Sequence, residues 1–288
     1  MKELLTGMEN SAGFLAWVAL AVLSEAAQYL SMASGRLRAE WTRERLAALA
    51  PLSYLLYSLP LGVFSGRSLL ALLALALAAA YWFIVFPKSR WSQALFVALM
   101  AAPLLFKVFP SIYGRAGDLR MDFLGQLVWI RISVVTILRD TEPEGVNFGF
   151  WPEWREWKVG AAHFAAALPV VCGLAQWTGF ATFTWPVWPW WETLLRAMGT
   201  FAGILWVVAL SEEFLFRGLL QRWIGLAGAS ALFGMAHLGF RAFPNWQFAL
   251  VAAVAGVFYG LAFRRGNGIR AAMVTHALTV AVWRTLFR

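Results

Sequence analysis

Residues 193–223 read TLLRAMGTFAGILWVVALSEEFLFRGLLQRW and decide the fold class of this chain. The segment 193–215 is almost entirely apolar, and a helix needs about 20 apolar residues to cross the hydrocarbon core of a bilayer. Glu212 and Glu213 lie within that same run. We therefore predict a membrane-spanning helix that carries two adjacent carboxylates into the membrane.

The composition of the whole chain is that of a membrane protein. Of its 288 residues, 61% are hydrophobic and 14% are charged, whereas roughly a quarter of the residues in soluble domains are charged. Such a chain has too little polar surface to remain in water, and its 17 Trp residues fit aromatic belts at the membrane interfaces. We predict an all-α fold, a polytopic transmembrane helical bundle with about eight to ten membrane helices.

Apolar runs of suitable length mark the candidate spans. They cover residues 13–33, 46–64, 68–86, 92–109, 158–179, 193–215, 224–240, 246–263 and 271–287. A further run from Met121 to Leu138 contains Arg131. Because a charged side chain is costly in lipid, this run either crosses the membrane, lies at its interface or packs inside the bundle.

The polar segment 139–157, RDTEPEGVNFGFWPEWREW, favours a loop because of its prolines, glycines and charges. We take it as the seam between a variable N-terminal transmembrane bundle with an interfacial segment, residues 1–150, and a C-terminal core, residues 151–288. The opening residues MKELLTGMEN carry acids and do not read as a removable signal peptide.

The charge pattern predicts the orientation in the membrane. The formal net charge is +9, and the basic residues gather in short clusters between spans, such as Arg264, Arg265 and Arg270. Cytoplasmic loops of membrane proteins have this pattern, so no nucleic-acid partner is expected. The compact loops and the Arg- and Ala-rich composition favour a multi-pass protein of the bacterial cytoplasmic (inner) membrane.

Ionisable residues inside a span are functional hypotheses by default. Glu213 lies four residues before Arg217, which puts both on one helix face within ion-pair reach. Glu212 points about 100° away, and a carboxylate in such a low-dielectric setting suits general-base chemistry. The alternative is that both acids reach the interface and only mark a helix end.

Two of the three histidines fall in later apolar segments, His237 and His276. At 1.5 Å per residue, these two and Glu212 lie roughly 8–16 Å below the cytoplasmic interface and can meet in one plane. His163 stands among alanines and is expected to be structural. Between the two histidine segments, Ala252, Gly256 and Gly260 form a small-residue face that lets helices approach closely.

These residues resemble the signatures of the CAAX prenyl protease and bacteriocin-processing (CPBP/Abi) family of intramembrane glutamate-type proteases. EEFLFR at 212–217 is similar to the EExxxR signature, FGMAH at 233–237 to FxxxH, and THALTV at 275–280 to the third signature. Phe233, which opens the second signature, counts as a supporting residue. The matching region runs from about residue 158 to 288.

The resemblance implies an intramembrane endopeptidase that hydrolyses a peptide bond. Glu212, with His237, would activate the attacking water, and His276 would stabilise the oxyanion. Glu213 and Arg217 would hold the site together as a pair. The substrate would be a membrane-associated protein or a lipidated peptide, met in contact with membrane lipid. The active site would face the cytoplasmic leaflet, and no cofactor is implied.

One position departs from the family pattern. The third signature normally ends with Asn or a similar polar residue four positions after its His, and here that position is Val280. Thr279 could substitute, or the oxyanion hole is weaker. A catalytically impaired relative that binds peptides, as an immunity or scaffold factor, is the alternative function.

Two other kinds of function remain open. Glu212, His237 and His276 also form a recognised zinc-ligand set, although zinc sites usually draw two ligands from one helix. The resemblance favours a metal-free site.

A transporter with a proton relay is the third class of function, but no inverted repeat is evident. The sequence indicates neither the substrate's identity nor the oligomeric state.

Overall fold

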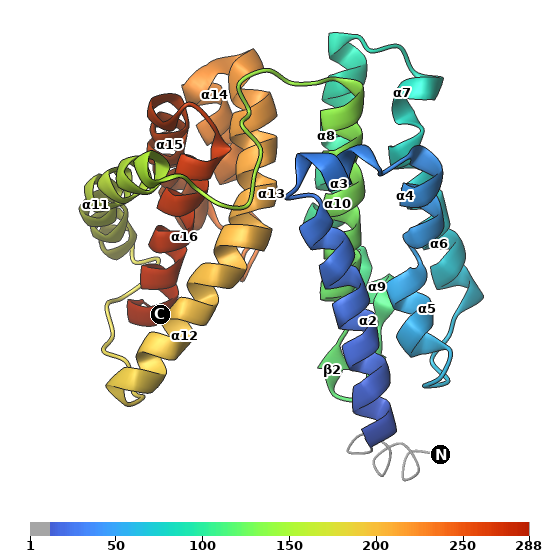
Figure 1. Ribbon diagram of the computed structural model, residues 1–288. Coiled ribbons are helices and arrows are strands. Elements are labelled where there is room, and N and C mark those ends of the chain that lie inside the picture. Colours follow the sequence, from blue (N-terminus) through green and yellow to red (C-terminus); the bar gives the residue numbers. More distant parts are fainter. Residues whose placement is uncertain (1–11, 288) are drawn as a thin grey trace. The chain divides into compact units, whose positions relative to one another are not determined.

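The computed structural model describes residues 12–287 and consists almost entirely of helices (Figure 1). The predicted helical class is confirmed. The chain divides into two compact units, Met1–Glu142 and Pro143–Arg288. This boundary falls inside the predicted polar loop, which runs between the last helix of the first unit and the first helix of the second. The expectation for MKELLTGMEN concerns residues outside the described part.

The first unit is organised around a buried helix, α10 (Asp122–Asp140). A two-stranded antiparallel hairpin precedes it, formed by β1 (Arg115–Ala116) and β2 (Leu119–Arg120). The helices before the hairpin are α2 (Ala12–Ser31), α3 (Gly35–Ala39), α4 (Arg43–Leu49), α5 (Leu52–Ser58), α6 (Gly66–Ala80), α7 (Trp82–Val85), α8 (Arg90–Leu105) and α9 (Phe109–Tyr113). Every residue of α10 from Val128 to Ile137 is buried. The run with Arg131 therefore packs inside its unit.

The charge in the middle of α10 is neutralised by a partner far away in the sequence. Arg131 donates two hydrogen bonds to Glu25 of α2, from Nε to Oε1 at 3.0 Å and from Nη2 to Oε2 at 3.1 Å. Both side chains are completely buried. The guanidinium also lies 4.8 Å from the centre of the Trp41 ring. This bidentate pair ties α2 to α10.

We expect Arg131→Met to destabilise the protein by about 3–5 kcal/mol, because it leaves the Glu25 carboxylate buried without a partner. The double variant Glu25→Leu/Arg131→Met should recover most of that loss, since no uncompensated charge remains. Both expectations can be tested by measuring the free energy of unfolding of each variant in detergent micelles. Arg115→Met is the control, because Arg115 pairs with Asp118 at the surface. Equal destabilisation by the single and double variants would contradict this account of the pair.

The predicted span 46–64 is wrong as a single helix. The chain forms α4 and α5 instead, interrupted at Pro51, which has no backbone N–H to continue the helical hydrogen bonds. The segment then turns at Gly62, whose φ is 68°. Helices α6 and α8 are apolar but have 15 and 16 residues, fewer than the about 20 needed to span a bilayer without adjustment.

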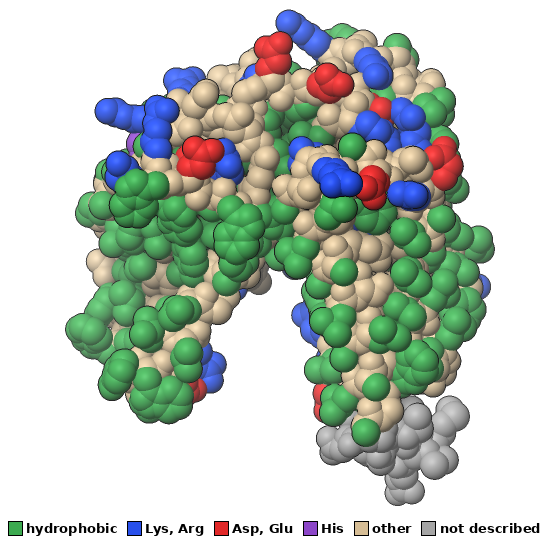
Figure 2. Space-filling model, viewed as in Figure 1, with side chains coloured by type: hydrophobic (Ala, Val, Ile, Leu, Met, Phe, Trp, Pro, Cys, Tyr) green, Lys and Arg blue, Asp and Glu red, His purple; other side chains and the backbone are tan. Residues whose placement is uncertain are grey.

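Four helical segments of the described residues are long and apolar enough to cross a membrane. They are Ala12–Ser31, Trp154–Trp177, Trp190–Ala236 and Trp246–Gly266. Crossings beyond these four stay a prediction. Figure 2 shows apolar side chains over the flanks of each unit. In each unit, most of the charged side chains seen in this view lie toward one end. Large apolar side chains such as Leu70, Val85 and Trp177 are exposed. The chain is an integral membrane protein.

The second unit packs its helices around α16 (Ile269–Leu286), drawn in red in Figure 1. The others are α11 (Trp154–Trp177), α12 (Trp190–Gly203), the π-helical η1 (Ile204–Ala209), α13 (Leu210–Glu213), the π-helical η2 (Phe214–Leu220), α14 (Gln221–Ala236) and α15 (Trp246–Gly266). The helical segment that begins at Trp190 is interrupted at Gly225, whose backbone is not helical (φ 73°, ψ 178°). This break lies just inside the predicted span 224–240, whereas the predicted gap between that span and 193–215 is helical.

Small residues bring these helices into close contact. A Cβ at Gly160 of α11 would lie 2.6 Å from the Cβ of Val274 on α16. On α15, the predicted small-residue face lies against the backbone of α14, since a Cβ at Gly256 would lie 3.4 Å from Ser230 Cα. The same face also receives polar side chains. Arg217 Nη2 donates to the Gly256 carbonyl at 2.9 Å, and Gln221 Nε2 donates to the Gly260 carbonyl at 3.1 Å.

Candidate active site

Glu213 is the centre of a buried ionic cluster. Its Oε2 lies 3.1 Å from Arg217 Nε, one helical turn away, and its Oε1 lies 2.8 Å from His276 Nδ1. The side chains of Glu213 and Arg217 are completely buried, and that of His276 nearly so. The pairing of Glu213 with Arg217 corresponds to the i, i+4 prediction. Its contact with His276 on α16 was not predicted.

Glu212 lies beside that cluster and lines a cavity. Its Oε2 lies 3.9 Å from His276 Nε2, and its side chain is 28% exposed. That oxygen is buried and has no hydrogen-bond partner within the described residues. Short π-helical segments lie on both sides of the Glu212–Glu213 pair, and such segments occur frequently at functional sites. Glu212 is therefore a carboxylate with a free acceptor at the cavity wall.

His237 lies at the C-terminal end of α14. Its Nδ1 is 2.7 Å from the carbonyl of Phe233, one turn earlier. A carbonyl only accepts, so Nδ1 carries the proton and Nε2 of the neutral ring is left as an acceptor. The ring is held between Phe233, at 4.6 Å between ring centres, and Phe248, at 5.2 Å. The imidazole is thus fixed in one tautomer.

The three predicted catalytic residues line one cavity of about 430 Å³. Its remaining wall is mainly apolar and aromatic, with two arginines: Val171, Ile204, Val208, Phe233, Phe240, Arg241, Phe248, Val251, Ala252, Ala255, Tyr259, Thr279, Val280, Trp283, Arg284 and Phe287. A cavity of this size, with a few convergent polar groups, is what a binding site for part of a peptide requires.

Phe233 lies at the contact between the ionic cluster and the histidines. Its ring centre is 4.6 Å from Arg217 Cζ and 5.9 Å from the His276 ring, which it meets edge-on. It also packs on His237. The supporting role implied for Phe233 therefore has a physical basis, because this ring holds the two imidazoles and the guanidinium in place.

Thr279 and Val280 both line the cavity. The Thr279 hydroxyl donates its proton to the Thr275 carbonyl of its own helix, at 2.8 Å. The predicted substitution of Thr279 for the usual Asn thus leaves no proton on Thr279 for a ligand, while Val280 offers neither a donor nor an acceptor.

Sequence reasoning missed Tyr259 of α15. Its ring stacks on His276, with 4.6 Å between centres and an angle of 11°. The available signal was a tyrosine inside an apolar run, next to the small-residue face that includes Gly256 and Gly260. His163 behaves as expected of a structural residue, because its Nδ1 bonds the Val159 carbonyl of its own helix at 2.8 Å.

Within residues 12–287, no group of three or more His, Cys, Asp or Glu side chains is arranged to hold a metal ion. Nδ1 of each cavity histidine is already engaged, with Glu213 for His276 and with a backbone carbonyl for His237. Each ring has only Nε2 to offer a ligand.

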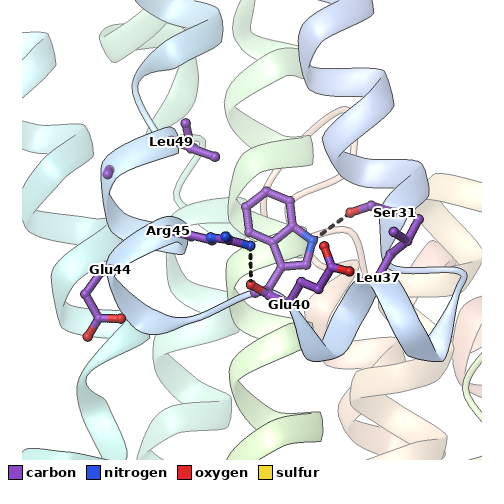
Figure 3. Close-up of a pocket in the computed structure, with 8 residues that line it drawn as sticks. Ser31, Leu37, Glu40, Glu44, Arg45 and Leu49 are labelled. Carbon is purple, nitrogen blue, oxygen red and sulfur yellow. Dashed lines mark hydrogen bonds between the residues drawn. The ribbon is translucent and has the colours of Figure 1, made fainter.

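A second cavity, of about 500 Å³, lies in the first unit (Figure 3). Arg45, Glu40 and Glu44 are among its lining residues, with Trp41. Its polar groups bond within the unit, because Trp41 Nε1 donates to Ser31 Oγ at 2.6 Å and Arg45 Nη1 donates to the Glu40 carbonyl at 3.0 Å. Backbone hydrogen bonding at the start of α4 lowers the pKa of Glu44. This cavity has no paired acid and histidine.

The second unit is thus a membrane helical core with a carboxylate, two histidines and a buried Glu–Arg pair around a cavity, a composition that suits hydrolytic chemistry inside a membrane. Residues 186–282 match the family model described as Type II CAAX prenyl endopeptidase Rce1-like. The resemblance to the CAAX protease family is thereby confirmed for this segment, which contains all three signatures.

A curated relative covers part of the same chain. The uncharacterized protein YpbD of Bacillus subtilis (strain 168) is 32% identical over 82 residues, which make up 28% of this chain and 42% of that protein. The match thus spans less than half of the relative's length. No solved structure matches this chain.

We expect His237→Ala to lower the rate of peptide cleavage by about 10²-fold or more, because general acid–base groups contribute about 10²–10⁴-fold. His163→Ala should leave the rate unchanged, since the His163 ring bonds the Val159 carbonyl of its own helix and does not line the cavity. Both rates can be measured as peptide cleavage by membranes that contain equal amounts of the two variants. A rate for His237→Ala equal to that of His163→Ala would remove His237 from the site.

Proposed function

We propose that this protein is a glutamate-dependent intramembrane endopeptidase. The observation that carries the proposal is the shared cavity of Glu212, His237 and His276, together with the ion pair that neutralises Glu213. One carboxylate is thereby free for chemistry while its neighbour is committed to structure. The match to a CAAX endopeptidase family supports the same reaction class.

In the proposed reaction, a water molecule bound between Glu212 and Nε2 of His237 attacks the carbonyl carbon of the scissile peptide. The free Oε2 of Glu212 takes the proton from that water as the new C–O bond forms. When the tetrahedral intermediate collapses, the C–N bond breaks and this proton passes to the leaving nitrogen. The products are a carboxylic acid and an amine, and Glu212 is regenerated.

His276 acts in this scheme through its contact with Glu213. Its Nδ1–H is donated to Glu213, so Nε2 can donate a hydrogen bond only when the ring is an imidazolium. Glu213 Oε1 lies 2.8 Å from Nδ1 of this ring, and Glu212 Oε2 lies 3.9 Å from its Nε2. The charged ring would stabilise the oxyanion of the intermediate, in the way that preorganised donors commonly do.

The mechanism is proposed as metal-free, since the acid, the base and the oxyanion donor are all side chains of this chain. The substrate is proposed to be a membrane-associated protein or a lipidated peptide that enters from the lipid. The basic residues at one end of the second unit, among them Arg222, Arg264 and Arg265, support a cytoplasmic (inner) membrane location with the active site toward the cytoplasmic leaflet.

The test is a comparison of membrane proteomes from cells with the wild-type chain and cells with Glu212→Gln. A peptide that accumulates uncut only in the variant identifies the substrate and supports the proposal. Identical processing in both strains would contradict it.

A second candidate function is peptide binding without cleavage, as in an immunity or scaffold factor. Val280 favours it, because the cavity carries an apolar side chain where the family pattern has a polar one. Complementation of a deletion phenotype by the Glu212→Gln chain would support this function and exclude the protease.

A further inference from the structure

The proposed reaction requires a second donor for the oxyanion, and two side chains near His276 are unsuited to it. Val280 is apolar, and Thr279 has donated its only hydroxyl proton to the Thr275 carbonyl. Oxyanion holes usually combine two donors. The question is therefore which other group at the cavity wall has a proton to offer.

Tyr259 is a hydroxyl-bearing side chain that lies against His276. Its ring lies parallel to the His276 imidazole, with 4.6 Å between ring centres. Tyr259 lines the same cavity as Thr279 and Val280, and the Thr279 hydroxyl gives its proton to the Thr275 carbonyl. A phenol carries one O–H donor, so Tyr259 has a proton to offer at this cavity wall.

The surroundings hold the Tyr259 ring in place. Phe233 meets it edge-on, with 5.9 Å between ring centres, and Arg217 Cζ lies 5.5 Å from its centre. The residue is only 2% exposed. Since the ring is packed on several sides, little rearrangement is needed before its hydroxyl can act, which is the condition for electrostatic preorganisation.

We propose that Tyr259 is a catalytic residue that donates the hydrogen bond missing at Val280 to the oxyanion. This assignment rests on the proposed endopeptidase function. When the carbonyl carbon becomes tetrahedral, its oxygen gains negative charge, and the Tyr259 O–H donates a hydrogen bond to that oxygen. No bond of the tyrosine breaks, and its proton stays on the phenol while His276 donates from Nε2.

Tyr259→Phe tests the hydroxyl without removing the ring. In proteoliposomes with a quenched-fluorescent farnesylated CAAX peptide as the probe, kcat should fall about 10²–10³-fold while KM changes little. The double variant Tyr259→Phe/Val280→Asn should regain at least about tenfold of the lost kcat, because an amide then stands at the position that the family uses. Tyr81→Phe, in the first unit, is the matched control.

Three results would count against the assignment. If Tyr259→Phe keeps the wild-type kcat while Glu212→Gln is inactive, Tyr259 is not catalytic, although the protease function stands. A loss that Val280→Asn does not recover means that the hydroxyl has a structural role. If the wild-type chain cleaves neither this probe nor any membrane peptide, the proposed function and the assignment fail together.

Discussion

Replacing Glu212 with Gln is expected to reduce peptide cleavage by about 10³–10⁴-fold, at the upper end of what a general base contributes. The amide is nearly the same size as the carboxylate but cannot take a proton from water. Among residues 12–287, the Glu212 Oε2 that faces His276 has no hydrogen-bond partner to lose. The variant should therefore fold normally, and its loss should fall on kcat.

The comparison needs a variant that makes the same chemical change elsewhere. Glu192→Gln serves, because Glu192 forms a surface i, i+4 pair with Arg196 at 2.7 Å, outside the cavity. Its activity should equal that of the wild type. Cleavage rates and melting temperatures of both variants, purified in detergent, separate lost chemistry from lost folding. If Glu212→Gln cleaves as fast as Glu192→Gln, Glu212 is not the base.

Replacing Glu213 with Gln should cost both stability and activity. The amide no longer compensates the charge of Arg217, which is completely buried, and breaking such a pair costs about 3–5 kcal/mol. It also loses the carboxylate that accepts from His276 Nδ1 at 2.8 Å. The free energy of unfolding and the cleavage rate should therefore fall together, unlike in Glu212→Gln.

The double variant Glu213→Leu/Arg217→Met distinguishes the two effects. Without a buried charge, it should recover most of the stability, but it should stay inactive because His276 has lost its anionic partner. Recovery of cleavage along with stability would mean that the Glu213–Arg217 pair is purely structural. A stable Glu213→Gln variant would contradict the ionic cluster itself.

The helical class and the second unit could be predicted because their signals are local. Apolar runs near the length of a bilayer indicated the helices, and the i, i+4 spacing of Glu213 and Arg217 indicated their pairing. The small residues at Gly256 and Gly260 indicated a close approach, which the backbone of α14 makes at Gly256. The side chains of Arg217 and Gln221 also reach this face.

The features that were missed depend on contacts between distant segments. Arg131 was recognised as out of place, but its partner Glu25 lies 106 residues earlier, and no spacing rule connects them. The contact of His276 with Glu213 spans 63 residues. The break at Pro51 was hidden by the apolar residues on both sides of it. Thr279 has a suitable side chain, yet its proton is taken by its own helix, which only the coordinates reveal.

The central claim is that Glu212 and His237 hold one water molecule in a polar cavity. An experimental structure of the protein in a lipid nanodisc, at a resolution that reveals ordered water, tests this directly. We predict a water within hydrogen-bond distance of both Glu212 Oε2 and His237 Nε2. A Glu212 carboxylate turned toward lipid, or a His237 ring too far away to share that water, would contradict the account.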